Sequence, residues 1–222
     1  MTKTGEAARP PMELDADSLL DTIRLRKREI TIGATLFVAL AGGIYLWRES
    51  VLKKDERAER AFNAAAGPYY SGNKALAQSD LEKMADRYAG TAAGVQGTML
   101  LSQILFENGT WDEGIKKLQA VQGSSAAGRF APSIEGLVAG GYADQKKYDD
   151  AARHYLAAAD KAPFPADKDL YRAEAARVLT LAGKKEEARK IWAELASRLD
   201  SPAIGEAKIR LGELQAATPA KP

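Results

Sequence analysis

The sequence of 222 residues contains no cysteine and a single histidine. The absence of cysteine excludes a disulfide framework, a thiolate zinc site, an iron–sulfur cluster, a cysteine nucleophile and a lipid-modified N-terminal cysteine. It does not exclude an oxidising compartment, since a chain without thiols is compatible with any redox poise. The fold must therefore be held together by packing, without covalent cross-links.

The sequence also lacks the local motifs of common enzyme sites. No GxSxG, GxxxxGK[ST], HExxH or EF-hand pattern occurs. The single histidine, His154, follows Asp150 by one helical turn, which makes that carboxylate its candidate partner in a catalytic pair. A lone histidine on a helical repeat is more often structural than catalytic. We therefore expect a protein that is not an enzyme, with no cofactor, metal site or small-molecule substrate.

Charge of one sign is not in excess, because 32 basic residues face 30 acidic ones. The basic residues are interspersed with acids, which argues against a phosphate-binding stripe and hence against nucleic acid as a partner. Acidic pairs recur at residues 112–113, 149–150 and 186–187. Metal ligation or general acid chemistry is one explanation, but carboxylates at the start of a helix are favoured by its dipole. We interpret the pairs as helix starts.

One segment is free of charge for eighteen residues. Residues 30–47 read ITIGATLFVALAGGIYLW, between Glu29 and Arg48. A helix of this length spans about 27 Å, close to the roughly 30 Å hydrocarbon core of a bilayer. Tyr45 and Trp47 stand at one end, where aromatic rings favour the membrane interface. The segment predicts an uncleaved transmembrane helix, with a signal peptide cleaved after residues 39–41 as the alternative. A buried core helix is a further alternative, but it would normally show a polar face.

The basic cluster RLRKR at 24–28 abuts the N-terminal end of this segment, whereas later basic residues are diluted with acids. Short basic flanks stay in the cytoplasm, so residues 1–29 are predicted to form a cytoplasmic tail and the later domain to lie outside the cytoplasm. Thr35, Ala39 and Gly43 fall four residues apart on one helix face. That small-residue face is our candidate surface for packing against another membrane helix.

Beyond residue 47 the sequence repeats with a period of 37 residues. Alanine, leucine, lysine and glutamate dominate, which favours helix throughout. Each period is interpreted as a helix hairpin that buries its apolar face only against its neighbours. The equivalent positions form four series: Ala77, Gly114, Ala151 and Ala188; Leu81, Leu118, Tyr155 and Trp192; Leu101, Val138 and Ala175; and Tyr88, Ser125, Ala162 and Leu199.

The predicted fold class is therefore all-α, with about four hairpins and a C-terminal capping helix over residues 48–217 and a disordered tail over 218–222. The sequence after residue 47 allows the helix expected over 48–66 to continue directly from the transmembrane helix. Gly136, Gly140 and Gly141 weaken helix propensity, which suggests close helix approach or a flexible point in the third hairpin. The expected helices are 48–66, 74–88, 92–107, 112–122, 132–144, 149–161, 168–182, 185–199 and 203–216.

At these residues the chain resembles tetratricopeptide repeats. Their pattern of glycine, aromatic, acidic pair, small residue and large residue is matched by residues 109–118, by residues 148–155 and, with Lys185 in place of the aromatic, by residues 183–192. The period is longer than the family's usual value of about 34 residues. The resemblance implies an α-solenoid whose first helices line a partner-binding groove. The groove candidates that it singles out are Gln96, Met99, Gln103, Phe106, Glu107, Arg177 and Thr180, with Ser133, Gly136, Gly140 and Asp144 between them.

The full layout resembles the family of ancillary subunits of the bacterial Sec translocon. Members of that family are single-pass proteins of the inner membrane, and their periplasmic repeat domain links the translocon to periplasmic chaperones. The resemblance implies a non-enzymatic adaptor whose partners are membrane-complex subunits, the translocon or chaperones. The alternative is a structural subunit of a larger membrane complex that assembles through its transmembrane helix.

Overall fold

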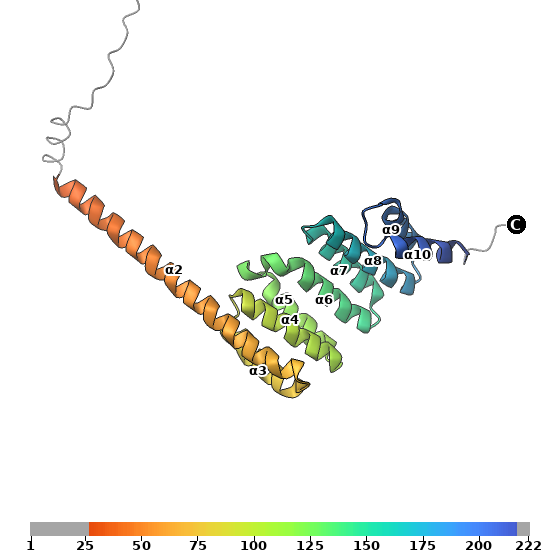
Figure 1. Cartoon of the computed structure of the whole chain (residues 1–222), viewed down its shortest axis with the longest axis horizontal. Helices are drawn as coiled ribbons and strands as arrows, with labels where there is room; N and C mark the ends of the chain where they lie inside the picture. The colour runs from red at the N-terminus through yellow and green to blue at the C-terminus, as the bar shows by residue number, and fades with distance from the viewer. Residues whose placement is uncertain (1–26, 217–222) are drawn as a thin grey trace, which may run out of the picture. The chain divides into compact units, whose positions relative to one another are not determined.

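The computed structural model describes residues 27–216, which form α-helices, one 3-10 helix and no strand (Figure 1). The predicted all-α class is confirmed. Most of tail 1–29 and all of tail 218–222 lie outside the described residues. The helices are α2 (Lys27–Tyr70), α3 (Lys74–Arg87), α4 (Ala92–Glu107), α5 (Trp111–Gln122), η1 (Ser125–Phe130), α6 (Ala131–Asp144), α7 (Tyr148–Lys161), α8 (Pro165–Leu181), α9 (Lys185–Ser197) and α10 (Ile204–Ala216).

Helix α2 contains the uncharged segment and continues beyond it without interruption. An 18-residue stretch has a mean hydropathy of 1.8 and none of it is buried, which makes α2 the one helix in residues 27–216 apolar and long enough to cross a membrane. The hydroxyls of Thr31 and Thr35 donate to carbonyls four residues earlier, at 2.7 and 2.8 Å. Both polar groups are thus satisfied within the helix. The chain divides into two compact units within α2, between Leu52 and Lys53.

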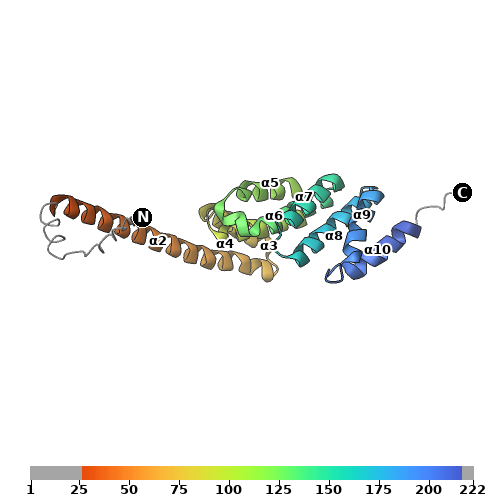
Figure 2. The ribbon, with the colours of Figure 1, turned by 90° about the horizontal axis from the view of Figure 1, so that it is seen from above.

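In the second unit, helices α3 to α10 follow one another side by side in chain order (Figures 1 and 2). The predicted helix boundaries agree with the structure to within a few residues. Helix α8 begins three residues early because Pro165, whose fixed φ suits a first helical position, starts it. Residues 125–130, expected as part of a loop, form the 3-10 helix η1.

Each hairpin turns at a residue in the left-handed backbone region. At Gly109, the amide donates to the carbonyl of Phe106, and the next amide, that of Thr110, donates to the carbonyl of Leu105, both at 2.9 Å. This is a Schellman cap, which favours glycine because a side chain is strained there. The same pattern recurs at an exact step of 37 residues, at Gly72, Gly109, Lys146 and Gly183, with φ of 86°, 77°, 60° and 78°.

The repeating apolar positions form the contacts between hairpins. The three alanines of the first series are buried, as are Leu81, Leu118 and Trp192 of the second and the whole third series. The fourth series is mixed: Ala162 is buried and Tyr88 packs against the core, whereas Leu199 and Ser125 do not. Leu199 is 89% exposed because α9 ends at Ser197 and the chain has already left the helix, and Ser125 lies in η1.

The acidic pairs lie in the first turns of α5, α7 and α9, as predicted. They also join successive hairpins. The ammonium of Lys147 is 3.9 Å from the carboxylate of Asp112, and that of Lys184 is 2.9 Å from the carboxylate of Asp149. Both partners advance by 37 residues, so an equivalent ion pair recurs between successive hairpins.

Lys146 is the one non-glycine among the four left-handed turn residues. We expect Lys146→Gly to raise the free energy of unfolding by about 1 kcal/mol, because it removes the strain that a side chain meets in this region. Denaturant unfolding of the full chain in detergent micelles measures the change. Lys190→Gly, an exposed site inside α9, is the control and should destabilise by a similar amount. A Lys146→Gly protein no more stable than the parent would contradict this account of the turn.

Candidate binding groove

Three successive first helices, α4, α6 and α8, line an open hollow of about 360 Å³. Two of the predicted groove residues, Met99 and Gln103, lie in it, together with Ser133 and Gly136 from the intervening unit. The sequence did not single out its aromatic and acidic members on α7 and α8. The lining residues are Met99, Gln103, Ser133, Gly136, Leu137, Tyr155, Tyr171 and Glu174.

Glycine on α6 allows helix α8 to place an aromatic ring directly against it. A Cβ at Gly136 would lie 2.8 Å from a ring carbon of Tyr171, which is closer than any side chain tolerates. A Cβ at Gly140 would lie 3.8 Å from the hydroxyl of Tyr155, which is ordinary contact. The expectation of close helix approach is thus met at Gly136, where the missing side chain shapes the hollow.

The hollow combines a phenol with a charged rim. Burial, and after it the carboxylates of Glu174 and Asp144, raises the pKa of Tyr155 to about 12. Its hydroxyl is therefore uncharged at neutral pH and can both donate and accept a hydrogen bond. Glu174 forms an ion pair with Arg177, three residues further along α8. The hollow thus brings apolar, hydroxyl and carboxylate groups side by side.

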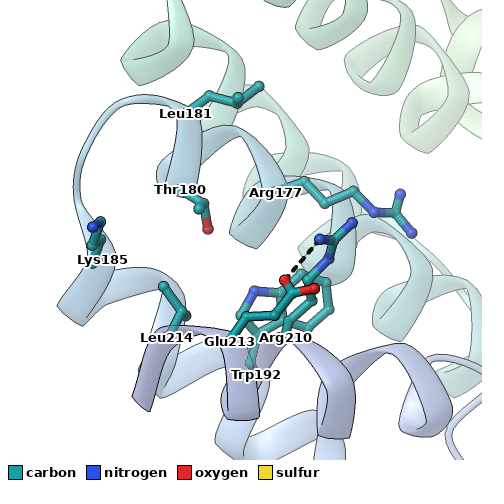
Figure 3. A pocket seen from close by; sticks show the side chains of 8 residues that line it. All are labelled: Arg177, Thr180, Leu181, Lys185, Trp192, Arg210, Glu213 and Leu214. Atoms are coloured by element: carbon teal, nitrogen blue, oxygen red, sulfur yellow. Dashed lines mark hydrogen bonds and ion pairs between the residues drawn. The ribbon is translucent and has the colours of Figure 1, made fainter. Parts of the chain in front are cut away.

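Arg177 links this hollow to a second one. Its guanidinium donates to Glu174 on the same helix and, from Nε at 2.7 Å, to Glu206 on α10. The hydrogen bond to Glu206 is the main cause that raises the pKa of Arg177, and the pKa of Glu206 is lowered for the same reason. Arg177 and Thr180, both predicted groove residues, line this second hollow of about 460 Å³ between α8, α9 and α10 (Figure 3).

Phe106 and Glu107 lie in neither hollow. The ring of Phe106 is wedged against two glycines, so that a Cβ at Gly114 would be 2.5 Å from it and one at Gly141 would be 2.9 Å from it. Its place is in the contact between α4, α5 and α6. The carboxylate of Glu107 accepts from the hydroxyl of Tyr69 at 2.8 Å and lies 2.6 Å from the ammonium of Lys74. It therefore ties the first hairpin to α4.

Gln96 is exposed on α4 and does not line either hollow. On α2, Thr35, Ala39 and Gly43 are exposed as well, and a Cβ at Gly43 would meet nothing within 4 Å. The predicted residues therefore separate by place. Met99 and Gln103 are in the first hollow, Arg177 and Thr180 are in the second, and the face on α2 is open.

His154 does not pair with Asp150, which binds Arg153 instead. Its Nδ1 lies 2.7 Å from the carboxylate of Glu135, and its ring stacks on that of Tyr142 with the centroids 5.3 Å apart. The expected partner is thus corrected. Sequence spacing could not reveal the true one because it lies 19 residues away on α6.

Glu135 is the centre of this cluster and only 5% exposed. It also accepts from Gln122 on α5 and from Lys161 on α7. Burial raises its pKa, but the hydrogen bonds from Lys161 and His154 outweigh burial, so that the net shift is downward. The cluster joins α5, α6 and α7 across the third hairpin.

Comparison with known proteins identifies a family for this repeat architecture. A family model described as "Tetratricopeptide repeat-like domain" matches residues 27–216, so that it includes the apolar helix as well as the hairpins. The nearly identical TPR-like repeats of a candidate kinesin light chain from Podosopora anserina superpose with a TM-score of 0.57, at 14% identity over 73% of this chain and 87% of that chain. A second crystal structure of those repeats, of a form with one substituted residue, gives 0.56, at 14% identity over 73% and 86%. No curated protein sequence matches significantly.

The buried carboxylate predicts a pH dependence of stability. We expect Glu135→Gln to lower the free energy of unfolding at pH 7 by about 1–3 kcal/mol, because a buried hydrogen-bonded charge loses its partners. A lowered folded-state pKa stabilises the protein above the unfolded value of about 4.3, and this contribution is lost as the pH falls through the folded value. The difference between parent and variant should therefore stay constant from pH 7 to about pH 5 and shrink as the pH falls below about 4.3 in denaturant titrations.

Glu113→Gln is the control for this prediction. Glu113 pairs with Lys117 at 3.9 Å at the surface. Loss of this pair should change the free energy of unfolding by well under about 1 kcal/mol, both at pH 7 and at acidic pH. Equal effects of the two substitutions would show that the cluster around Glu135 does not stabilise the third hairpin.

Proposed function

The chain belongs to the family of tetratricopeptide repeat-like domains, and from that membership we propose that it is a non-enzymatic adaptor, held at a membrane, that binds other proteins in its groove. The observation that carries the proposal is the hollow built across three successive hairpins by Met99, Gly136 and Tyr171. Such a surface takes a peptide or helix of a partner, because each hairpin contributes to a continuous strip of apolar and polar groups.

The membrane anchor in this proposal is the uncharged part of α2. Its 18-residue apolar stretch is unburied, and a soluble protein would gain by covering so much apolar surface. The basic residues that precede it support an orientation with the N-terminus in the cytoplasm and the hairpins outside. The resemblance of the layout to ancillary subunits of the Sec translocon supports the rest of the proposal: a bacterial inner membrane, a periplasmic repeat domain, and the translocon and periplasmic chaperones as partners.

A structural subunit of a larger membrane complex is the second candidate. The observation that favours it is the face of Thr35, Ala39 and Gly43, which is exposed in the described structure and small enough for another helix to approach closely. Both candidates are non-enzymatic. They differ in which surface, the groove or the span, selects the partner.

Photo-crosslinking in intact membranes tests the adaptor directly. A benzophenone amino acid at Gln103, inside the groove, should form cross-links to partner proteins. The same amino acid at Gln119, which is exposed on the second helix α5, is the matched control and should form few. Cross-links of equal yield from both positions, or none from Gln103, would contradict binding in the groove.

Substitution in the span separates the two candidates. Gly43→Leu fills the small-residue face, whereas Ala41→Leu adds the same bulk on the opposite side of the helix. For an adaptor, the cross-links from Gln103 should persist in both variants. Loss of every co-purifying protein in Gly43→Leu but not in Ala41→Leu would instead favour the structural subunit.

A further inference from the structure

The second hollow contains a buried hydrogen-bond donor that has no acceptor. Trp192 is 0% exposed, and its indole N–H donates to no group in residues 27–216. Trp192 lines the hollow, and the nitrogen edge of its ring faces the space bounded by Thr180, Lys185 and Leu214 (Figure 3). Leaving such a donor unpaired costs about 1–3 kcal/mol. A ligand that brings an acceptor would recover this cost.

The cations around the hollow are not equivalent. Arg177 is bound by Glu174 and Glu206. Arg210 pairs with Glu213 at 2.9 Å and with Glu206 at 3.6 Å. Both guanidiniums are therefore already neutralised by carboxylates.

Lys185 differs from both arginines, because no carboxylate within residues 27–216 forms an ion pair with it. The donors of the lining that have no acceptor in the described part of the chain are thus one ammonium and one indole N–H. They match a single negative charge with two or more acceptor atoms. A carboxylate fits this description, whereas a phosphate dianion would meet the nearby carboxylates with too little positive charge to balance it.

The rest of the hollow is apolar. Leu181 is 63% exposed at its rim, and Leu214 and the buried Trp192 are among the other residues that line it. A volume of about 460 Å³ is in the range that takes a ligand group of a few side chains. An exposed leucine beside a buried aromatic ring favours a large apolar side chain next to the charged group.

We propose that the hollow between α8, α9 and α10 binds a peptide segment of a partner protein in which a carboxylate stands beside a large apolar side chain. Trp192 and Lys185 donate to the carboxylate, and Leu181, Leu214 and the indole ring cover the apolar side chain. The inference rests on the proposed function, and it adds the chemistry of the ligand. Arg177 lines this hollow and pairs with Glu174, which lines the first hollow, so a bound segment can continue from this site toward the groove.

The test uses the full chain in detergent micelles with ¹⁵N-labelled tryptophan. The probe is acetyl-Gly-Ser-Gly-Ser-Phe with a free C-terminal carboxylate, compared with the same peptide as its amide and with a peptide that ends in glycine. We expect the indole cross-peak of Trp192, assigned through Trp192→Phe, to shift only with the free acid that ends in phenylalanine. The cross-peaks of Trp47 and Trp111 are internal controls. An unmoved Trp192 peak, or equal shifts with acid and amide, would overturn the proposal.

A second measurement avoids any change to the core. Lys185→Gln should weaken binding of the free acid about two- to fivefold, as loss of an exposed charge contact does. Lys190→Gln, an exposed lysine on the same helix, should leave binding unchanged. Equal effects of the two variants would count against the site. If the peptide fails to bind while cross-links from Gln103 persist, this inference fails and the proposed function stands. If the peptide binds but Gln103 forms no cross-links, binding in the groove is contradicted and the site between α8, α9 and α10 stands.

Discussion

Close approach of successive helices at small residues is the constraint on which the hairpin stack depends. At Gly114 a side chain would collide with the ring of Phe106, and at Gly141 it would collide with the same ring. The hydroxyl of Ser102 donates across this contact to the carbonyl of Gly114, at 3.1 Å. Because no disulfide is available, this packing must hold α4, α5 and α6 together.

The same constraint forms the surface that we assign to partner binding. Tyr171 lies against the bare backbone of Gly136, so its ring becomes part of the floor of the groove instead of being pushed outward. Further along α8, Arg177 ties Glu174 to Glu206 and fixes α10 at the end of the stack. The groove and the second hollow are thus consequences of how α8 is held by its neighbours on both sides.

Periodicity predicted the helices well because the packing between hairpins is local in sequence and repeats. The step of 37 residues carries the buried alanines, the left-handed turns and the pair of Asp112 with Lys147 alike. Within the candidate site, the positions of Met99 and Gln103 followed from the resemblance to the repeat family. Phe106 could not be placed in this way, because a large residue on a first helix can either line the groove or pack between helices. Gly114 and Gly141 leave room for its ring between α4, α5 and α6, and the repeat pattern does not show this.

The interactions that sequence reasoning missed are particular side-chain pairs across distant helices. Glu135 with His154 and Arg177 with Glu206 occur once each and leave no periodic signal. The unpaired indole of Trp192 was equally hidden, because its position in the repeat predicts only a large buried residue. Such features depend on three helices meeting in space, which one repeating pattern does not encode.

Hydrogen–deuterium exchange of the protein alone and in complexes isolated from membranes tests the central claim, that partners bind across the first helices, most directly. The account predicts added protection in the segments 99–103, 133–137 and 171–177, with little change in the second helix α5. Protection confined to α5, or no added protection in the hairpins while partners remain bound, would contradict it.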